Sequence, residues 1–530
     1  MNRPLSELPH DVESLQQMLA EQWTVIAEQS QKLTQKQDRI AYLEEQLRLL
    51  SQRHFGRRSE GHREQLELQL FNEAEVVADQ APVAEEPPPI TVNGHQRPRR
   101  TPRQLPKDLP RVDVPHELSE AEQQCTACGQ PLQRIGEEVS EQLAVIPQQY
   151  YVIRHIRGKY ACSCQACIRT AALPAQPLPG SQASATLLAH TMVAKYHDGL
   201  PLYRQEAQAA RVGLELPRAK LARWLIATAP LLQPLYNLLQ DSLFGYDIVQ
   251  TDDTGIQVLK EAGRSPSTSS YLWIRRGGSP EQPVVRVDYA PSKSGETAYG
   301  LLSECHGYVV CDGASNLKLS IARNNLLPVY CNDHARRKFA EILKSSPLRE
   351  KARHWAAAKA IGYYKQLYRL ERDIAELSPE QKRQQRQSRA GPLWDEFLAW
   401  ARQIQNDGVH HRRTREALAY LLDHADGLRR YCEDGRLPIS NIRSEHVAKT
   451  IAVARKNFLF ADTPGGAHAS AMIYSLLETA KANGQSVYQY LAVLLDTLPK
   501  ATGLADYEAL LPWNLNPTAV AQRYAELPKP

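Results

Sequence analysis

The first fifty residues carry apolar side chains in a seven-residue repeat. Apolar residues recur at every seventh position from Val12 to Leu47, and leucines three positions further on keep the same register in several of the repeats. Such a seam is typical of a coiled coil, which we expect over residues 11–60 and which would join at least two copies of the chain. A lone amphipathic helix packed on its own domain is the alternative.

The pattern changes to helical at residues 181–240, after a short β-rich stretch that reads QQYYVIRHIRGKYACSCQAC. Apolar residues there follow a helical period, and Gly213 and Pro217 interrupt it, which predicts short helices separated by tight breaks. This arrangement suits a helix-turn-helix-like DNA-binding domain, although any small helical bundle produces a similar pattern.

Alternating, β-branched segments begin after residue 241. The stretches DIVQTDDTGIQVL, SYLWIRRG and PVVRVDYA predict three strands, and they precede a helix and a further strand, GYVVCD, that ends at Asp312. Three strands, a helix and a strand in this order predict a ribonuclease-H-like α/β catalytic core, with its first part at 241–340. Polar helical sequence at 341–437 then predicts an α-helical insertion, because amphipathic core-like sequence resumes only at 438–485.

The remaining segments have simpler patterns. Residues 61–120 pass from an acidic, proline-rich stretch to an arginine-rich one and predict a flexible linker. Residues 121–180 contain two cysteine clusters and predict a zinc-binding domain. We expect residues 486–530 to form a C-terminal tail. The overall prediction is a multidomain α/β protein with helical parts.

Composition narrows the class of protein only slightly. With 42% hydrophobic and 23% charged residues the chain is an ordinary globular protein, and a net charge of +5 is a weak argument for nucleic acid. The basic residues nevertheless gather in separate clusters, which is typical of a protein that contacts a polyanion at many points, although each cluster alone could be a solvated surface. The chain starts without a signal-peptide pattern and has no apolar run of the roughly 18 residues that a membrane span needs, so we expect it to be cytoplasmic and not bound to a membrane.

Three acids stand where an unpaired charge is costly. Asp252 interrupts an apolar strand, Asp312 ends another, and Glu445 lies near the start of a helix. Converging carboxylates repel one another unless a hard divalent cation such as Mg²⁺ or Mn²⁺ joins them, and two such ions can promote phosphoryl transfer on nucleic acid. Each acid has an alternative interpretation as a turn residue or a solvated carboxylate.

Other residues are candidates for support of that site or for contact with DNA. Asn441 lies four residues before Glu445 and shares its helical face. Further along the chain, Arg455 and Lys456 could contact phosphates. The basic linker and the segment HARRKF supply further candidates for phosphate contact, namely Arg97, Arg99, Arg100, Arg103, Arg336 and Arg337.

The cysteines predict a structural zinc site. Cys125 and Cys128 form one CxxC pair, and Cys164 and Cys167 form a second pair at a suitable separation. Cys162 is an alternative downstream ligand, although the spacing favours the pair Cys164 and Cys167. Clustered cysteines in a reducing compartment favour metal binding over disulfides.

Long motifs along nearly the whole chain resemble the insertion-sequence 66 family of bacterial transposases. They include FGRRSE, CTACG, HIRGKYAC, KYHDGLPLYRQE, VQTDDTGIQVL, VVCDGASNL, YCNDHARRKF, LYRLERDIAE, SNIRSEHVAK and RKNFLFADTPGGAHASAMIYSLLETAKANG. The resemblance implies a DDE transposase with a ribonuclease-H-like core, preceded by zinc-binding, helix-turn-helix and coiled-coil segments. Such an enzyme cleaves and joins transposon ends with divalent metal, at a bacterial, nucleoid-associated location.

The family motifs imply roles for individual residues. They put the catalytic, metal-binding acids at Asp252, Asp312 and Glu445, with two divalent ions per site. Asp253 departs from the glutamate that the family usually has there, and no aromatic residue follows Asp312-Gly313. The segment YCNDHARR resembles a Cys-x-x-His motif of several transposase groups, which implies a supporting, more structural role for Cys331 and His334.

The resemblance also implies the partners of the protein. They are the double-stranded DNA of the transposon's terminal inverted repeats, the target DNA, a second copy of the chain, and small accessory proteins encoded by the same element. Two alternatives remain open from the sequence. One is a catalytically inactive DNA-binding regulator, and the other is a ribonuclease-H-like nuclease or resolvase that cuts without joining strands.

Overall fold

A computed structural model describes residues 149–161, 168–345, 355–408 and 411–529, together with the backbone of two short strands, β1 (Thr91–Val92) and β2 (His95–Gln96), which pair antiparallel. The predicted coiled coil, the linker arginines and the candidate zinc cysteines at 125, 128, 162, 164 and 167 lie outside the described residues. The chain divides into two units, and the described residues from 156 to 528 belong to the larger one. The structural description below concerns this larger unit.

A mixed β-sheet with the strand order β7-β6-β5-β8-β9 forms the centre of the larger unit. Its strands are β5 (Ile248–Val258), β6 (Ser269–Gly277), β7 (Val284–Ala290), β8 (Tyr308–Cys311) and β9 (Leu327–Tyr330). Strand β6 pairs antiparallel with both β5 and β7, whereas β8 pairs parallel with β5 and β9 pairs parallel with β8. A sixth strand, β10 (Phe460–Ala461), pairs parallel with the end of β5. This order is consistent with the predicted ribonuclease-H-like core. A separate antiparallel pair is formed by β3 (Lys159–Ala161) and β4 (Ile168–Thr170).

The helices before the sheet share its hydrophobic core. They are α3 (Ala185–Met192), a π-helical turn (Val193–His197), α4 (Leu202–Arg211), α5 (Arg218–Ala227) and α6 (Ala229–Phe244). Gly213 has φ of 76° just after α4, and Pro217 is the N-cap of α5, so the predicted breaks are confirmed. Leu188 and Leu232 are fully buried in one cluster with sheet residues such as Val249, so these helices and the sheet fold as one body.

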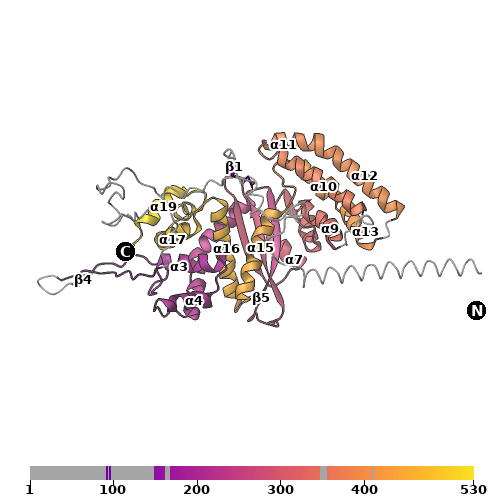
Figure 1. The fold of residues 1–530 in the computed structure, drawn as a ribbon. Helices are drawn as coiled ribbons and strands as arrows, with labels where there is room; N and C mark the ends of the chain where they lie inside the picture. The colour runs from indigo at the N-terminus through magenta and orange to yellow at the C-terminus, as the bar shows by residue number, and fades with distance from the viewer. Residues whose placement is uncertain are drawn as a thin grey trace, which may run out of the picture. The chain divides into compact units, whose positions relative to one another are not determined.

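A helical insertion separates β9 from the last part of the core. Between the strands lie α7 (Gly295–Leu302), a 3-10 turn (Ser315–Leu317) and α8 (Lys318–Arg323), and after β9 comes α9 (Asn332–Ser345). The insertion consists of α10 (Trp355–Asp373), α11 (Pro379–Gln385), a π turn (Arg386–Ala390), α12 (Gly391–Asp407), α13 (Arg412–Asp423), α14 (Ala425–Arg429) and a 3-10 turn (Arg430–Cys432). Its interior is aromatic, with Tyr364, Trp394 and Phe397 in mutual ring contact. In Figure 1 these helices stand on the opposite side of the sheet from α3 and α17.

The C-terminal region completes the core. Its elements are α15 (Ile442–Phe458), β10 (Phe460–Ala461), α16 (Pro464–Ala482), α17 (Val487–Thr497), a 3-10 turn (Leu498–Lys500), α18 (Leu504–Glu508) and α19 (Pro517–Glu526). The expected tail at 486–530 is therefore wrong. Tyr490 and Leu494 are fully buried, because α17 is apolar along most of its length and packs against α3.

Helix α16 closes the outer edge of the sheet. The Thr479 hydroxyl accepts a hydrogen bond from the Val285 N–H at 3.0 Å and donates one to the Val285 carbonyl at 2.9 Å. The Ser475 hydroxyl accepts from the Val287 N–H at 2.8 Å. These two side chains satisfy backbone groups of β7 that would otherwise be an open strand edge. Within the described part of the chain, no helix combines the length and apolar character needed to cross a membrane.

Candidate active site

The strand register brings Asp252 and Asp312 to the same level of the sheet. In the parallel pair of β5 and β8, Gln250 lies opposite Val310. Asp252 follows Gln250 by two residues, and Asp312 follows Val310 by two residues. Because neighbouring parallel strands advance by the same rise per residue, the two acids reach the same height where β8 ends. The Asp312 carboxylate is oriented by the Ala314 N–H, which donates to its Oδ1 at 2.9 Å.

The two adjacent acids of β5 have different surroundings. The carboxylate of Asp253 forms an ion pair with Lys293, with 2.7 Å between its Oδ2 and the lysine Nζ. The Oδ1 of Asp252 accepts the N–H of Asp253 at 2.9 Å. Since side chains alternate across a strand, Asp253 points to the face where Lys293 lies and Asp252 to the opposite face.

Helix α15 carries Glu445 to the sheet, and Asn441 fixes the start of that helix. Asn441 is the N-cap of α15 and is fully buried. Its Nδ2 donates to the carbonyl of Thr251 at 2.9 Å, the residue directly before Asp252. Its backbone N–H donates to the Sγ of Cys331 at 3.2 Å. The helix packs along β5 (Figure 1), so Asn441 ties the origin of α15 to the strand that holds the first acid.

Residues 331 to 337 surround the carboxylate of Glu445. The Cys331 thiol donates to its Oε1 at 3.3 Å, and the Nδ1 of His334 lies 3.4 Å from the same oxygen. The Nη2 of Arg337 lies 3.5 Å from Oε2. Burial, followed by the charges of Glu445 and Asp333, raises the pKa of Cys331, so the residue is a protonated thiol that can donate. Cys331, His334 and Glu445 also form a group with metal-ligating atoms within 4.8 Å of one another.

The three acids influence one another electrostatically. The pKa of Asp252 is raised to about 7, mainly by burial and then by the negative charges of Glu445 and Asp312, while the Asp253 N–H opposes the rise. The charges of Glu445 and Asp312 thus act on Asp252 although the three acids come from distant segments of the chain. A divalent cation with a preference for oxygen ligands would relieve the repulsion, so the donor set fits Mg²⁺ or Mn²⁺.

Comparison with known protein families identifies the core. The profile of the transposase IS66 family matches residues 180–469, which include all three acids. This chain belongs to the IS66 family of transposases. Three further profiles match: the zinc-finger binding domain of transposase IS66 at 122–165, the transposase C of IS166 homeodomain at 42–114, and the IS66 C-terminal element at 475–513.

Relatives of this family member are found in Sinorhizobium fredii strain NGR234. The protein y4jD, described as uncharacterized, is 32% identical over 447 residues, which cover 82% of this chain and 85% of its own. The protein y4qI, also described as uncharacterized, is 28% identical over 546 residues, covering 98% of this chain and 99% of its own. Family membership implies transposition and DNA binding. It also suggests divalent metal for the DDE domain and zinc for the zinc-finger domain.

The zinc-finger match covers four of the five candidate cysteines. The matched residues 122–165 include Cys125, Cys128, Cys162 and Cys164, and they end before Cys167. Which of the downstream cysteines bind zinc stays a prediction.

The candidate DNA-contact residues of the catalytic core differ in accessibility. Arg336 is only 2% exposed, so its guanidinium does not lie on a surface that a phosphate can reach. Arg337 is accessible, with 40% of its side chain exposed beside Glu445. Lys456 is exposed near the end of α15. The guanidinium of Arg455 lies over Gly255 of β5, because its Nη1 is 3.5 Å from the position that a Cβ would take there. Of these four residues, Arg337 and Lys456 thus offer exposed side chains for phosphate contact, and Arg336 does not.

Some residues at the site were not predicted from the sequence. Lys293 lies in the loop after β7, where the charges of Asp253, Asp312 and Asp252 favour its protonated form and raise its pKa, although burial lowers it. Tyr420, on α13 of the insertion, and His424, the C-cap of that helix, lie against the Asp312-Gly313 turn. No local motif distinguishes these residues in the sequence, because their role depends on tertiary contacts.

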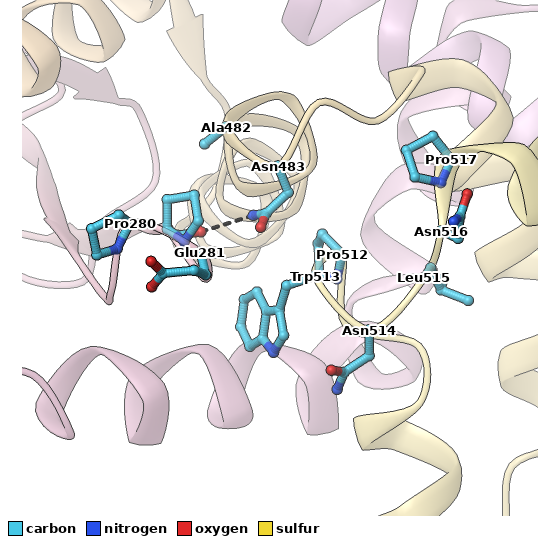
Figure 2. Close-up of a pocket in the computed structure, with 11 residues that line it drawn as sticks. Pro280, Glu281, Ala482, Asn483, Pro512, Trp513, Asn514, Leu515, Asn516 and Pro517 are labelled. Carbon is cyan, nitrogen blue, oxygen red and sulfur yellow. Dashed lines mark hydrogen bonds between the residues drawn. The ribbon is translucent and has the colours of Figure 1, made fainter. Parts of the chain in front are cut away.

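A pocket of about 520 Å³ lies away from the acids. It is formed by the β6–β7 turn at Pro280 and Glu281, the end of α16 at Asn483, and residues 512–517, as Figure 2 shows. Asn483 donates to the Pro283 carbonyl at its edge, at 2.9 Å. None of the three acids lines this pocket, so the proposed chemistry does not use it.

Proposed function

We propose that the protein binds the ends of an insertion sequence and catalyses metal-dependent cleavage and transfer of DNA strands. The observation that carries this proposal is the convergence of Asp252, Asp312 and Glu445, because burial and then the charges of the other two acids raise the pKa of Asp252 to about 7. Family membership and the strand order of the core support the same reaction class.

The three carboxylates would hold two divalent ions, Mg²⁺ or Mn²⁺. When bound, such ions supply activation of a water or a terminal 3′-hydroxyl and stabilisation of the leaving oxygen at a phosphodiester. The chain's own groups orient the acids. Asn441 anchors the helix of Glu445, and the Ala314 N–H orients the carboxylate of Asp312. The thiol of Cys331 and the ring of His334 hold the Glu445 side chain as supporting residues.

Basic residues around the acids would hold the DNA backbone. Arg337 has an exposed side chain beside Glu445, and Lys456 has one near the end of α15. Arg455 lies beside Gly255 of β5. Such contacts fix the position of a duplex without reading its sequence. Recognition of the terminal inverted repeats would fall to the helices at 181–240, the zinc-binding domain and the basic linker. The N-terminal coiled coil would pair two protomers, since two DNA ends must meet, and small accessory proteins from the same element would assist.

Strand cleavage and joining by the purified full-length protein test the proposal. The substrate is labelled duplex DNA that carries the ends of the element, with Mg²⁺ or with EDTA, and the matched variant is Asp252→Asn. We expect metal-dependent cleavage at the ends and joining to target DNA by the wild type, and neither by the variant. Binding of the ends without cleavage would favour the inactive regulator, and cleavage without joining would favour a nuclease or resolvase.

A further inference from the structure

The helical insertion contacts the second acid of the site directly. The hydroxyl of Tyr420, on α13, donates a hydrogen bond to the backbone carbonyl of Asp312 at 2.9 Å. These residues are 108 positions apart in the sequence. The contact therefore joins the insertion to the turn that leaves β8, at the point where the acid projects into the site.

Gly313 makes this close approach possible. It has φ of 80°, a conformation that other residues adopt only with strain. A Cβ at this position would lie 3.1 Å from the Tyr420 hydroxyl oxygen and 3.2 Å from Cδ2 of His424. A side chain at 313 would therefore strain the turn and also push the rings of Tyr420 and His424 away from it.

The Tyr420 ring is held firmly within the insertion. It stacks on His424, with ring centroids 4.2 Å apart and 18° between the planes. The Nδ1 of His424 lies 2.9 Å from the Tyr420 carbonyl oxygen. Lys338 of α9 lies over the Tyr420 ring, with its Nζ 4.4 Å from the ring centroid. A hydroxyl on a ring fixed in this way is a preorganised donor, since little freedom is lost when it binds.

Two hydrogen bonds thus hold the Asp312 turn from different sides. The Ala314 N–H holds Oδ1 of the carboxylate, which leaves Oδ2 without a hydrogen bond from the described residues at this turn. Tyr420 holds the backbone carbonyl of the same residue. Together they restrict both the position of the Asp312 backbone and the direction of its side chain.

We propose that Tyr420 is a positioning residue for Asp312, through which the helical insertion sets the orientation of the second acid. This inference rests on the proposed function, because the orientation matters only if Asp312 takes part in catalysis. It assigns a role to the insertion beyond its own folding. Correct docking of α13 becomes a condition for a complete set of acids.

The test compares Tyr420→Phe, which removes only the hydroxyl, with Tyr363→Phe. Tyr363 is a matched control in the same insertion, because its hydroxyl donates to Glu396 at 2.8 Å and its ring is buried against Phe397. Three quantities are measured on full-length protein: the rate constant and KM for DNA cleavage, the affinity for Mn²⁺ in the absence of DNA, and the thermal unfolding temperature. Tyr363→Phe should behave like the wild type in the first two.

We expect Tyr420→Phe to lower the cleavage rate constant about tenfold with an unchanged KM for DNA, since small displacements of a reacting group have effects of this size or larger. Its Mn²⁺ affinity should fall several-fold, and its unfolding temperature should match that of Tyr363→Phe. A variant with wild-type rate and wild-type Mn²⁺ affinity overturns the inference. The inference is also overturned if Tyr363→Phe loses as much activity as Tyr420→Phe. It is overturned as well if Tyr420→Phe loses activity only because it unfolds at the assay temperature.

Failure of the proposed function gives a different result. In that case the wild type itself cleaves no DNA in Mg²⁺ or Mn²⁺. The Mn²⁺ measurement still decides on Tyr420 then, because a several-fold loss of affinity in Tyr420→Phe alone supports its effect on Asp312, and equal affinities contradict it.

Discussion

Asp252 and Asp312 lie at the same level of two neighbouring parallel strands, because Gln250 and Val310 pair two residues before them. This alignment depends on backbone register alone. A shift of one residue between β5 and β8 would turn one of the two side chains to the other face of the sheet. The site is therefore specified first by strand pairing, and the side chains around it refine the arrangement.

The adjacent acids Asp252 and Asp253 should respond very differently to substitution. We expect Asp252→Asn to lower the rate of strand cleavage on the order of 10³-fold or more, because the group contacts the reacting centre. Asp253→Glu should retain most of the activity, since a longer carboxylate can still reach the Lys293 amine that lies 2.7 Å from Asp253. Cleavage assays at saturating Mg²⁺ measure both. Equal losses in the two variants would contradict the division of roles.

Replacement of Asn441 should affect stability and activity together. Asn441→Ala removes the bond to the Thr251 carbonyl and leaves a buried acceptor unpaired, which costs about 1–3 kcal/mol of unfolding free energy. It also releases the start of α15, one turn before Glu445. The control is Asn483→Ala, which removes amide bonds to the Pro283 and Thr479 carbonyls far from the acids. Urea unfolding should show a loss for both variants, and cleavage assays should show a loss for Asn441→Ala alone.

Zinc content should depend on the first cysteine pair. Purified protein should contain about one zinc ion per chain, as expected for a four-cysteine site. Cys125→Ser should abolish the bound zinc, whereas Cys305→Ser should leave it unchanged, because Cys305 is buried in the hydrophobic core. Elemental analysis of the three proteins measures this. Comparison of Cys162→Ser, Cys164→Ser and Cys167→Ser would then identify the downstream ligands.

A buried charge cluster beside the sheet should make stability depend on acid pH. Asp288 accepts hydrogen bonds from Arg275, Arg286 and Tyr236. Burial raises the pKa of Asp288, but the charges of Arg275 and Arg286 outweigh it and hold the pKa below its ordinary value of 3.8. A lowered pKa in the folded state means that the stabilisation is complete above pH 3.8 and is lost as the pH falls through the folded-state pKa.

Asp288→Asn should therefore cost about 3–5 kcal/mol of unfolding free energy at neutral pH, since it leaves two buried guanidinium groups without their carboxylate. The difference from the wild type should shrink as the pH falls below 3.8. The control is Asp496→Asn, which removes an accessible ion pair with Lys500 and should cost less than about 1 kcal/mol. Urea unfolding between neutral and acid pH measures the difference. A constant difference at all pH values would argue against the charge cluster as its cause.

Much of the catalytic core could be predicted from the sequence. Alternation in DIVQTDDTGIQVL and its neighbours indicated the strands, and their succession along the chain indicated a ribonuclease-H-like core. The choice of Asp252, Asp312 and Glu445 followed from the cost of a charge in an apolar strand and from the family motifs. The structure brings the three together, and their catalytic role stays a prediction.

Other features could not be predicted, for physical reasons. Tyr420 and Lys293 reach the site only through the packing of distant segments, which no local period encodes. Arg336 and Arg337 belong to the same basic segment and were equal candidates for phosphate contact. On helix α9, however, the side chain of Arg336 is buried and that of Arg337 is exposed. The expected tail at 486–530 was wrong, although the apolar stretch VYQYLAVLLDTL carried the signal of a buried helix.

The position of the insertion between β9 and α15 has a consequence during synthesis. A nascent chain that has left the ribosome only as far as the end of α14 contains Asp252 and Asp312 but not Glu445, and it also lacks α16, which closes the edge of β7. Since domains fold largely as their residues emerge, the trio of acids is completed only after the insertion has been translated. Truncated products that end before Glu445 would therefore lack one of the three acids, and we expect them to be unable to cleave DNA.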